Sequence, residues 1–273
     1  MTRQRWTVVV TMLVLFAVVA HGVASAQAAV ATAGVAAGKG THELIVSAAM
    51  SLKDGLAGIV AAFEKARPGV HVAVNFGGSG ALATQIEQGA PVDVFVSADH
   101  KDVLRLDGKG LLASGSAAPW IRNALVVVTL ASAPVQVASL TDLPDARIKR
   151  IAVGNPATVP AGRYAAEAMT AAGVRDRVAD RLVMCENVRQ VLDYVVRGEV
   201  DAGFVFATDA RTRAAELRLL AVPANLHVPI VYGTGVVAAS TQHDLAAEFV
   251  AFLRTGEAVQ ALETLGFVAP AAP

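Results

Sequence analysis

A loop of small residues, Gly77-Gly78-Ser79-Gly80, has the composition of an anion-binding loop. Its glycines leave backbone N–H groups accessible, and Ser79 supplies the only side-chain donor. Residues 70–76 alternate as a half-buried strand does, and residues 81–88 have a helical pattern. Free N–H groups and the positive end of a helix dipole suit an anion. Any turn between a strand and a helix also favours small residues, so the loop alone leaves both interpretations open.

Three further loops of small residues follow expected strands, at residues 48–51, 155–162 and 186–188. Ligands of open α/β sheets bind at the carboxyl ends of the strands, next to helix N-termini. Ser51 lies near the N-cap of a helix expected over residues 52–66, where its hydroxyl can cap the helix or reach a ligand. All four loops could therefore bring backbone N–H groups to one site.

Serine hydroxyls and backbone N–H groups form a neutral set of donors. Such a set fits a fully deprotonated oxyanion, whose oxygens only accept hydrogen bonds. Several converging helix ends can hold a compact dianion without a basic side chain when water is excluded. A ligand that carries a proton would lack a matching acceptor in such a site.

Enzyme motifs are absent from the sequence. There is no Gly-x-Ser-x-Gly or His-Glu-x-x-His, and the glycine-rich loop lacks the Lys-Ser/Thr ending of a phosphate-binding Walker loop. A secreted hydrolase that uses Ser51 or Ser79 as nucleophile remains an alternative, and it needs a base within hydrogen-bond reach. No histidine lies in the four loops, and His100 is the one histidine worth inspecting for that role.

Two arginines, Arg163 and Arg189, lie in the first turns of expected helices beside these loops. We expect both side chains to be exposed. An arginine turned into the site would instead favour an organic carboxylate, which it binds through two parallel hydrogen bonds.

The composition narrows the class of protein. Of the 273 residues, 54% are hydrophobic and 17% charged, and the net charge is zero. The balance predicts a sizeable core and gives no electrostatic basis for binding nucleic acid or an anionic membrane. Cys185 is the only cysteine, so no intramolecular disulfide forms, and its apolar neighbours predict a buried, inert thiol. No cluster of His, Cys and carboxylates has the spacing of metal ligands.

The N-terminus has the pattern of a secretory signal peptide over residues 1–26. Arg3 and Arg5 precede an apolar run too short for a confident membrane span, and Ala24-Ser25-Ala26 forms a small-x-small cleavage site. Residues 27–40 are rich in Ala and Gly and are predicted to form a disordered linker. These features predict a periplasmic protein.

Strand and helix patterns alternate along the rest of the chain, which predicts an α/β fold with mainly parallel sheets. In its sequence motifs the chain resembles a known family, the periplasmic molybdate-binding proteins of ABC transporters. The resemblance runs from about residue 43 to residue 267. It is carried by several separate motifs in order: AAMSL at 48–52, GSGALATQIEQGAPVDVFVSAD at 78–99, NALVVV at 123–128, VGNP at 153–156, VPAGRYA at 159–165, ENVR at 186–189 and GFVFATDA at 203–210.

The resemblance implies a two-lobed periplasmic binding protein with the ligand in the cleft between the lobes. One lobe would comprise residues 41–120 and 231–273, and the other residues 121–230. Molybdate or tungstate would be the ligand, an ABC permease in the inner membrane the partner, and the protein a monomer without enzymatic activity or cofactor. The motif match places the oxyanion contacts on Ser51, Ser79, Ala161 and Val188.

One site position departs from the family pattern, because Phe206 stands where many members carry a tyrosine that donates its hydroxyl to the oxyanion. Phe206 would line the site without donating. A lost hydrogen bond to a charged group costs on the order of 1.5–3 kcal/mol. Tyr164 and Tyr232 are the candidates for compensation. Sulfate, phosphate or a small organic acid therefore remain alternative ligands.

Overall fold

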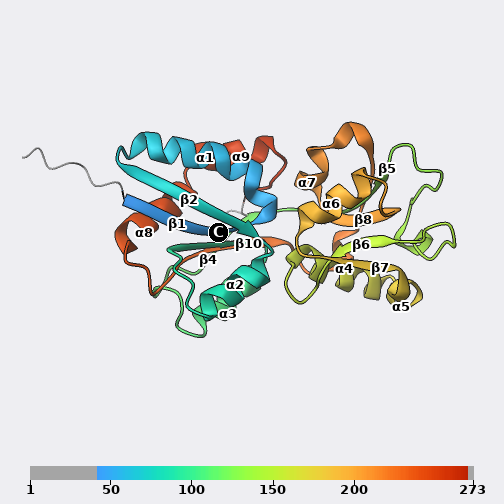
Figure 1. The fold of residues 1–273 in the computed structure, drawn as a ribbon, viewed down its shortest axis with the longest axis horizontal. Helices are drawn as coiled ribbons and strands as arrows, with labels where there is room; N and C mark the ends of the chain where they lie inside the picture. The colour runs from blue at the N-terminus through green and yellow to red at the C-terminus, as the bar shows by residue number, and fades with distance from the viewer. Residues whose placement is uncertain (1–41, 270–273) are drawn as a thin grey trace, which may run out of the picture. The chain divides into compact units, whose positions relative to one another are not determined.

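The computed structural model describes residues 42–269. The predicted signal peptide and linker lie outside these residues. Strands and helices alternate along the described part of the chain, which is organised around two five-stranded sheets (Figure 1). None of its helices is long and apolar enough to cross a membrane.

The first sheet has the strand order β2-β1-β3-β10-β4. Its strands are β1 (His42–Ala49), β2 (Val70–Gly77), β3 (Val94–Ser97), β4 (Ala118–Arg122) and β10 (Val231–Val236). Strand β1 pairs in parallel with β2 and β3, whereas β10 pairs antiparallel with β3 and β4. We call the part of the protein built on this sheet lobe I.

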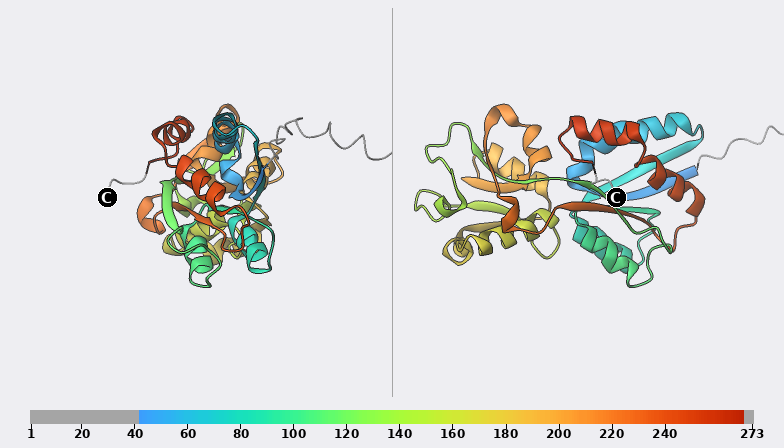
Figure 2. Two further views of the ribbon diagram at one scale, coloured as in Figure 1. Left: turned by 90° about the vertical axis from the view of Figure 1, so that its left-hand side faces the viewer. Right: turned by 180° about the vertical axis from the view of Figure 1, so that it is seen from behind.

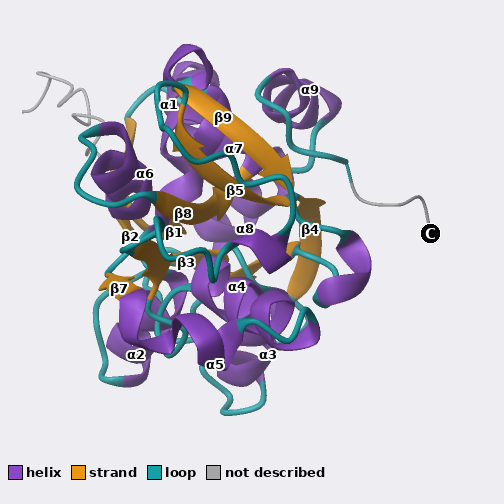
Figure 3. Cartoon of the chain, turned by 90° about the vertical axis from the view of Figure 1, so that its right-hand side faces the viewer, coloured by secondary structure: helices purple, strands orange, loops and turns teal. Residues whose placement is uncertain are grey.

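The second sheet repeats this plan with the order β7-β6-β8-β5-β9, and we call the part built on it lobe II. Its strands are β5 (Leu125–Leu130), β6 (Ile151–Gly154), β7 (Leu182–Cys185), β8 (Ala202–Phe206) and β9 (Leu217–Ala221). Strand β6 runs parallel to β7 and β8, and β5 runs antiparallel to β8 and β9. Figure 3 shows β8, β5 and β9 side by side in this lobe.

The two-lobed α/β fold with mainly parallel sheets is confirmed: in each sheet four strands run in one direction, and only β10 or β5 runs opposite to them. Each sheet combines two parallel with two antiparallel pairings. The reason lies in how the chain changes lobes, between Arg122 and Leu125 and again between Ala221 and Val231. A strand that enters from the other lobe begins at the sheet edge where the parallel strands end, so β5 and β10 must run opposite to them.

Helices cover both faces of each sheet (Figures 1 and 2). Lobe I carries α1 (Lys53–Ala66), α2 (Ser79–Glu87), α3 (His100–Asp107), α8 (His243–Phe252) and α9 (Gly256–Thr264). Leu56, Ile59 and Phe63 recur at helical spacing on α1 and are buried, and the Phe63 ring meets Phe249 of α8 edge-on at 5.1 Å. The C-terminal helices thus complete the core of the lobe in which the described chain begins.

Lobe II carries α4 (Pro160–Ala171), α5 (Arg175–Val178), α6 (Val188–Val196) and α7 (Ala207–Arg211). The apolar run of β5 from Leu125 to Val128 is at most 5% exposed, as expected for a strand covered on both faces. Short 3₁₀ turns occupy Met50–Leu52, Leu140–Asp142, Ala179–Arg181, Ala214–Glu216 and Ala224–Leu226.

Candidate functional site

The five positions expected to surround a ligand all line one small cavity. Ser51 and Ser79 come from lobe I, and Ala161, Val188 and Phe206 come from lobe II. Their side chains are at most 4% exposed. The cavity volume is about 10 Å³, roughly the space that one water molecule needs. The two lobes therefore leave a small, buried compartment between these residues.

The glycine-rich loop gives lobe I its close approach to lobe II. A Cβ on Gly78 would lie 2.8 Å from the Glu186 carbonyl oxygen and 2.9 Å from that of Thr158. The N–H of Gly80 donates to the Thr158 carbonyl at 2.9 Å. Glycine is required here because the backbone of the opposite lobe occupies the space of a side chain.

The Ser79 hydroxyl is held by the end of the next strand. Its Oγ accepts a hydrogen bond from the backbone N–H of Ala98 at 3.0 Å. Ser79 is the first residue of α2 and is fully buried next to the cavity. Because the Ala98 N–H occupies a lone pair, the hydroxyl proton of Ser79 is free to donate to a ligand.

Lobe II contributes the first turns of α4 and α6. Val159 is the N-cap of α4, and Ala161 follows Pro160 in its first turn, earlier than the sequence pattern indicated. A Cβ on Gly162 would lie 1.8 Å from the Gly154 carbonyl oxygen, so glycine lets α4 pack directly on the end of β6. Val188 opens α6.

Four backbone N–H groups at the cavity are free to donate a hydrogen bond. Within residues 42–269, the backbone N–H groups of Ser51, Ser79, Ala161 and Val188 have no hydrogen-bond acceptor in the protein. They belong to the first turns of helical segments, where the N–H groups have no intrahelical partner and the dipole is positive. No Lys or Arg lines the cavity. The arrangement can therefore bind an anion through neutral donors alone.

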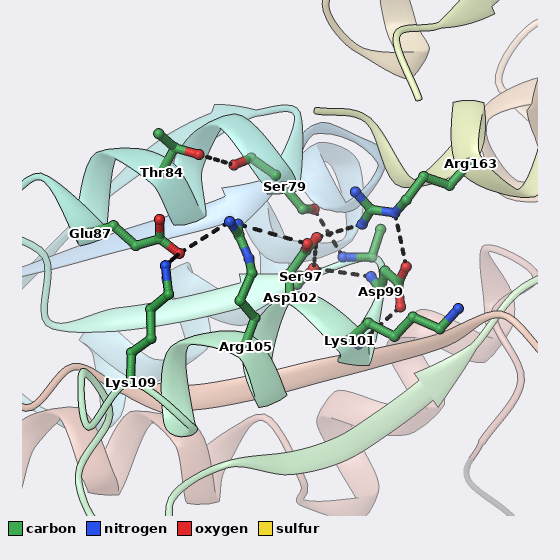
Figure 4. A network of polar contacts seen from close by, with 12 residues as sticks. Ser79, Thr84, Glu87, Ser97, Asp99, Lys101, Asp102, Arg105, Lys109 and Arg163 are labelled. Carbon is green, nitrogen blue, oxygen red and sulfur yellow. Dashed lines mark hydrogen bonds and ion pairs between the residues drawn. The ribbon is translucent and has the colours of Figure 1, made fainter. Parts of the chain in front are cut away.

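Both arginines beside the cavity are engaged by carboxylates of the described chain. Arg163 of α4 donates to Asp99 at 3.1 Å and to Asp102 at 2.7 Å across the lobes (Figure 4). Its side chain is therefore partly buried, at 23% exposed, rather than fully exposed as expected.

Arg189 of α6 makes the second connection between the lobes. It donates to Asp54 of α1 and, within its own lobe, to Asp209 at 2.6 Å. Burial raises the pKa of Asp209 to about 6, against the attraction of Arg189. Neither arginine lines the cavity, so the bidentate contact expected for an organic carboxylate is not formed.

The ring of Phe206 lines the cavity, and a tyrosine stands behind it. Tyr232 is fully buried, and its hydroxyl lies 2.8 Å from Ser51 Oγ. Tyr164 packs edge-on against Phe206 at 6.3 Å between ring centroids, without lining the cavity. Of the two tyrosines named from the sequence, Tyr232 is therefore the one hydrogen-bonded to a residue of the cavity.

Sequence reasoning named Asn123 only as part of a motif and assigned it no role at the site. Its side-chain N–H donates to the Tyr232 hydroxyl at 3.2 Å and to Thr208 Oγ1 at 2.9 Å. The available signal was a polar amide directly before a buried apolar strand. The carboxylate partners of the arginines were also missed, because no local pattern indicates them.

The hydrolase alternative lacks a base. No histidine lines the cavity, and His100 begins α3 outside it. The hydroxyls of Ser51 and Ser79 contact Tyr232 and the Ala98 N–H instead of an imidazole. Among residues 42–269, no group of three or more His, Cys, Asp or Glu side chains could hold a metal ion.

Cys185 is buried, as expected, at 1% exposed. Burial raises the pKa of its thiol to about 11, so the nucleophilic thiolate is scarce at neutral pH. The residue lies at the end of β7 beside an open groove of about 440 Å³ that shares Gly77 and Gly78 with the cavity. The open groove does not include Ser51 or Ser79.

A two-lobed α/β fold that encloses a small donor-lined cavity is the structure of a solute-binding protein. Residues 44–268 match the family of bacterial extracellular solute-binding proteins, and the chain belongs to this family. The expected relationship to the binding proteins of ABC transporters is confirmed by relatives and solved structures.

Three similar proteins illustrate this relationship. The chain is 37% identical over 226 residues to the putative ABC transporter substrate-binding lipoprotein YvgL of Bacillus subtilis, a match that covers 83% of this chain and 86% of the relative. It is 33% identical over 230 residues to the molybdate-binding protein ModA of Haemophilus influenzae, covering 83% and 90%. The periplasmic molybdate-binding protein of Azotobacter vinelandii superposes with a TM-score of 0.76 at 28% identity, covering 83% and 99%.

Proposed function

We propose that this protein captures molybdate or tungstate outside the cytoplasm and delivers it to an ABC permease in the inner membrane, without enzymatic activity or cofactor. The observation that carries the proposal is the closed cavity, whose wall offers serine hydroxyls and free backbone N–H groups but no basic side chain. Relatives named as molybdate-binding proteins support the choice of ligand.

Four residues would hold the oxyanion. Ser51 and Ser79 would donate through hydroxyl and backbone N–H groups from lobe I, while Ala161 and Val188 would donate backbone N–H groups from lobe II. An ion oxygen that accepts a hydrogen bond lies closer to the donor atom than two atoms in van der Waals contact would. Such short contacts suit a compact tetrahedral ion. Phe206 would close the cavity as an apolar wall.

The ion would join the two lobes. Because each lobe supplies half of the donors, the ligand makes all its hydrogen bonds only when the lobes are closed. The closed state would be the form that the permease recognises. We assign residues 41–120 with 231–273 to lobe I and residues 121–230 to lobe II, and we expect a periplasmic monomer that carries a cleavable signal peptide.

Sulfate is the second candidate ligand, because it is also a tetrahedral dianion without a proton and matches the same donors. A thermal-shift series on the purified mature protein separates the candidates, with molybdate, tungstate, sulfate, phosphate and glutamate added singly. A ligand at about 100 times its Kd stabilises the native state by roughly 2.7 kcal/mol. We expect molybdate and tungstate to stabilise the protein at the lowest concentrations, sulfate only at higher ones, and phosphate and glutamate not at all.

Two outcomes of this series contradict the proposal. Stabilisation by sulfate without molybdate would keep the class of site and change the ligand. No stabilisation by any oxyanion would remove the proposal altogether. Calorimetry with the stabilising ion then gives the affinity and the stoichiometry, for which one ion per chain is expected.

A further inference from the structure

A chain of hydrogen bonds runs from the backbone of lobe II to the cavity. Asn123 Oδ1 accepts from the N–H of Ala124 at 2.9 Å. Asn123 Nδ2 donates to the Tyr232 hydroxyl at 3.2 Å and to Thr208 Oγ1 at 2.9 Å. The Tyr232 hydroxyl lies 2.8 Å from Ser51 Oγ, which lines the cavity.

The first link decides which way the Asn123 amide faces. A backbone N–H can only donate, so the atom of Asn123 that meets Ala124 must be the carbonyl oxygen. The NH₂ group then faces Tyr232 and Thr208, and each of its two hydrogens has an acceptor. The Tyr232 oxygen is therefore an acceptor toward Asn123.

The second link decides where the Tyr232 proton points. Its oxygen already accepts from Asn123, and within the described residues the only other hydrogen-bond partner of the hydroxyl is Ser51 Oγ. Tyr232 is fully buried, and leaving a buried O–H without an acceptor is strongly unfavourable. Tyr232 therefore donates to Ser51, and the proton of Ser51 must point elsewhere, into the cavity.

We propose that Asn123 and Tyr232 are positioning residues that force the Ser51 hydroxyl to act as a donor, so that the site rejects oxyanions carrying a proton. This inference rests on the proposed oxyanion-binding function. A hydrogen phosphate or hydrogen arsenate ion presents an O–H that needs an acceptor. Ser51 Oγ could accept it only if Tyr232 ceased to donate.

The surroundings keep this arrangement in place. The Tyr232 ring packs against Phe206 at 5.9 Å and edge-on against Phe267 at 5.6 Å between centroids. Burial raises the pKa of Tyr232, so its hydroxyl keeps the proton that it donates. Phe206 offers no competing hydroxyl to Ser51 or Tyr232, so the direction of donation depends on Asn123 alone.

The decisive experiment compares ligand selectivity in the Tyr232→Phe variant and the unaltered protein at neutral pH. Calorimetry and thermal shifts are measured with molybdate, sulfate and inorganic phosphate, the last as the protonated probe. In the variant, Ser51 Oγ loses its donor and becomes able to accept. We expect molybdate and sulfate to bind about tenfold more weakly, while phosphate binding is retained or strengthened, so that the sulfate-to-phosphate preference falls.

Thr208→Val is the matched control. It removes the other acceptor of Asn123 and leaves the links to Tyr232 and Ser51 intact, so its sulfate-to-phosphate preference should equal that of the unaltered protein. The thermal stability of each unliganded variant checks that it is folded. A purely structural role of Tyr232 would weaken all three ions equally.

The outcomes distinguish this inference from the proposed function. If the unaltered protein binds molybdate but Tyr232→Phe leaves the sulfate-to-phosphate preference unchanged, the positioning role is wrong and the binding function stands. Preference of the unaltered protein for phosphate over sulfate would also overturn the inference. If no oxyanion binds the unaltered protein, the proposed function fails first.

Discussion

The guanidinium of Arg163 in lobe II donates from Nη2 to Asp102 Oδ2 in lobe I at 2.7 Å (Figure 4). Arg163 stands two residues after Ala161, in the first turn of α4. The residue that bridges the lobes therefore belongs to the same helical turn as a proposed ligand donor. We therefore expect closure of the lobes and the geometry of the cavity to be coupled through this turn.

Replacing Arg163 should weaken ligand binding and lower stability. Arg163→Gln leaves the buried carboxylate of Asp99 without its cationic partner and leaves Asp102 with only Arg105, at 4.0 Å. The expected loss is about 2 kcal/mol of unfolding free energy, between the values for surface and buried pairs. The Kd for molybdate should rise, because the closed state loses a contact between the lobes. Urea denaturation and calorimetry measure the two effects.

An exposed ion pair provides the control for this prediction. Arg147 pairs with Asp145 within lobe II, where the Arg147 side chain is 69% exposed. Arg147→Gln should leave both stability and affinity close to those of the unaltered protein. Equal affinities of the Arg147 and Arg163 variants would show that the bridge between the lobes does not contribute to binding.

Loss of the Ser79 hydroxyl should weaken binding more than it weakens the fold. Ser79→Ala removes a donor to the oxyanion, and a hydrogen bond to a charged group is worth about 1.5–3 kcal/mol, or roughly 10–100-fold in Kd. Ser116→Ala is the matched control, because Ser116 Oγ also accepts a backbone N–H, that of Val236 at 3.1 Å, away from the cavity. Calorimetry measures the affinity of both variants. An equal loss of affinity in both would contradict the proposed donation from Ser79 to the oxyanion.

Two glycine-to-alanine changes within helices should have opposite effects on stability. Gly162→Ala places a Cβ 1.8 Å from the Gly154 carbonyl oxygen, so α4 must shift away from β6. We expect a loss of roughly 2–4 kcal/mol, as for a severe steric conflict. Gly58→Ala on the exposed side of α1 meets nothing within 4 Å and should gain about 0.5–1 kcal/mol.

Chemical denaturation of the two variants tests this pair of predictions. Both changes add the same methyl group to a helix, so the comparison isolates the packing of α4 on β6. A Gly162 variant as stable as the unaltered protein would show that the approach of α4 to the strand end is adjustable. The Gly162 change should also weaken ligand binding, because it displaces Ala161.

Asp209 should make stability fall as pH rises from about 4 to 6. Burial raises its folded-state pKa from 3.8 to about 6, so over this window the native state binds more protons than the unfolded chain. The free energy of unfolding then decreases with increasing pH, by up to about 3 kcal/mol from this group. Arg189, Asp54 and Tyr232 are the charged and titratable groups that influence it.

Urea denaturation across this pH range measures the effect. Asp209→Asn should flatten the slope, because the amide does not titrate. Asp145→Asn should leave the slope above pH 5 unchanged, since its Arg147 partner lowers the pKa of Asp145 to about 2 and an unfolded aspartate, with a pKa of about 3.9, is also ionised there. A slope that persists in the Asp209 variant would assign the pH dependence to other groups.

Local patterns along the chain were enough to locate the elements that carry the site. Apolar periodicity located the strands and the helices that follow them, and small residues marked the loops at their junctions. Gly89, which follows α2, has φ +86°, the left-handed conformation that favours glycine after a helix end. The loops of small residues could be located because strand ends and helix starts are local properties of the chain, whereas the resemblance to a family assigned the individual positions Ser51, Ser79, Ala161, Val188 and Phe206.

Tertiary structure decided which groups meet across long separations. The proline in β4 hid that strand from the sequence pattern, although an edge strand tolerates Pro119 because one side of it needs no ladder hydrogen bond. Strand β10 runs opposite to β3 because the chain enters lobe I from lobe II, at the edge of the sheet where the parallel strands end.

Side-chain partners were likewise set by the fold. Ser51 and Tyr232 are 181 residues apart, and Arg163 and Asp102 are 61 apart. Nothing in local composition selects one buried partner over another. That choice depends on how the two lobes close, which brings distant strand ends into contact and requires each buried polar group to find a hydrogen-bond partner.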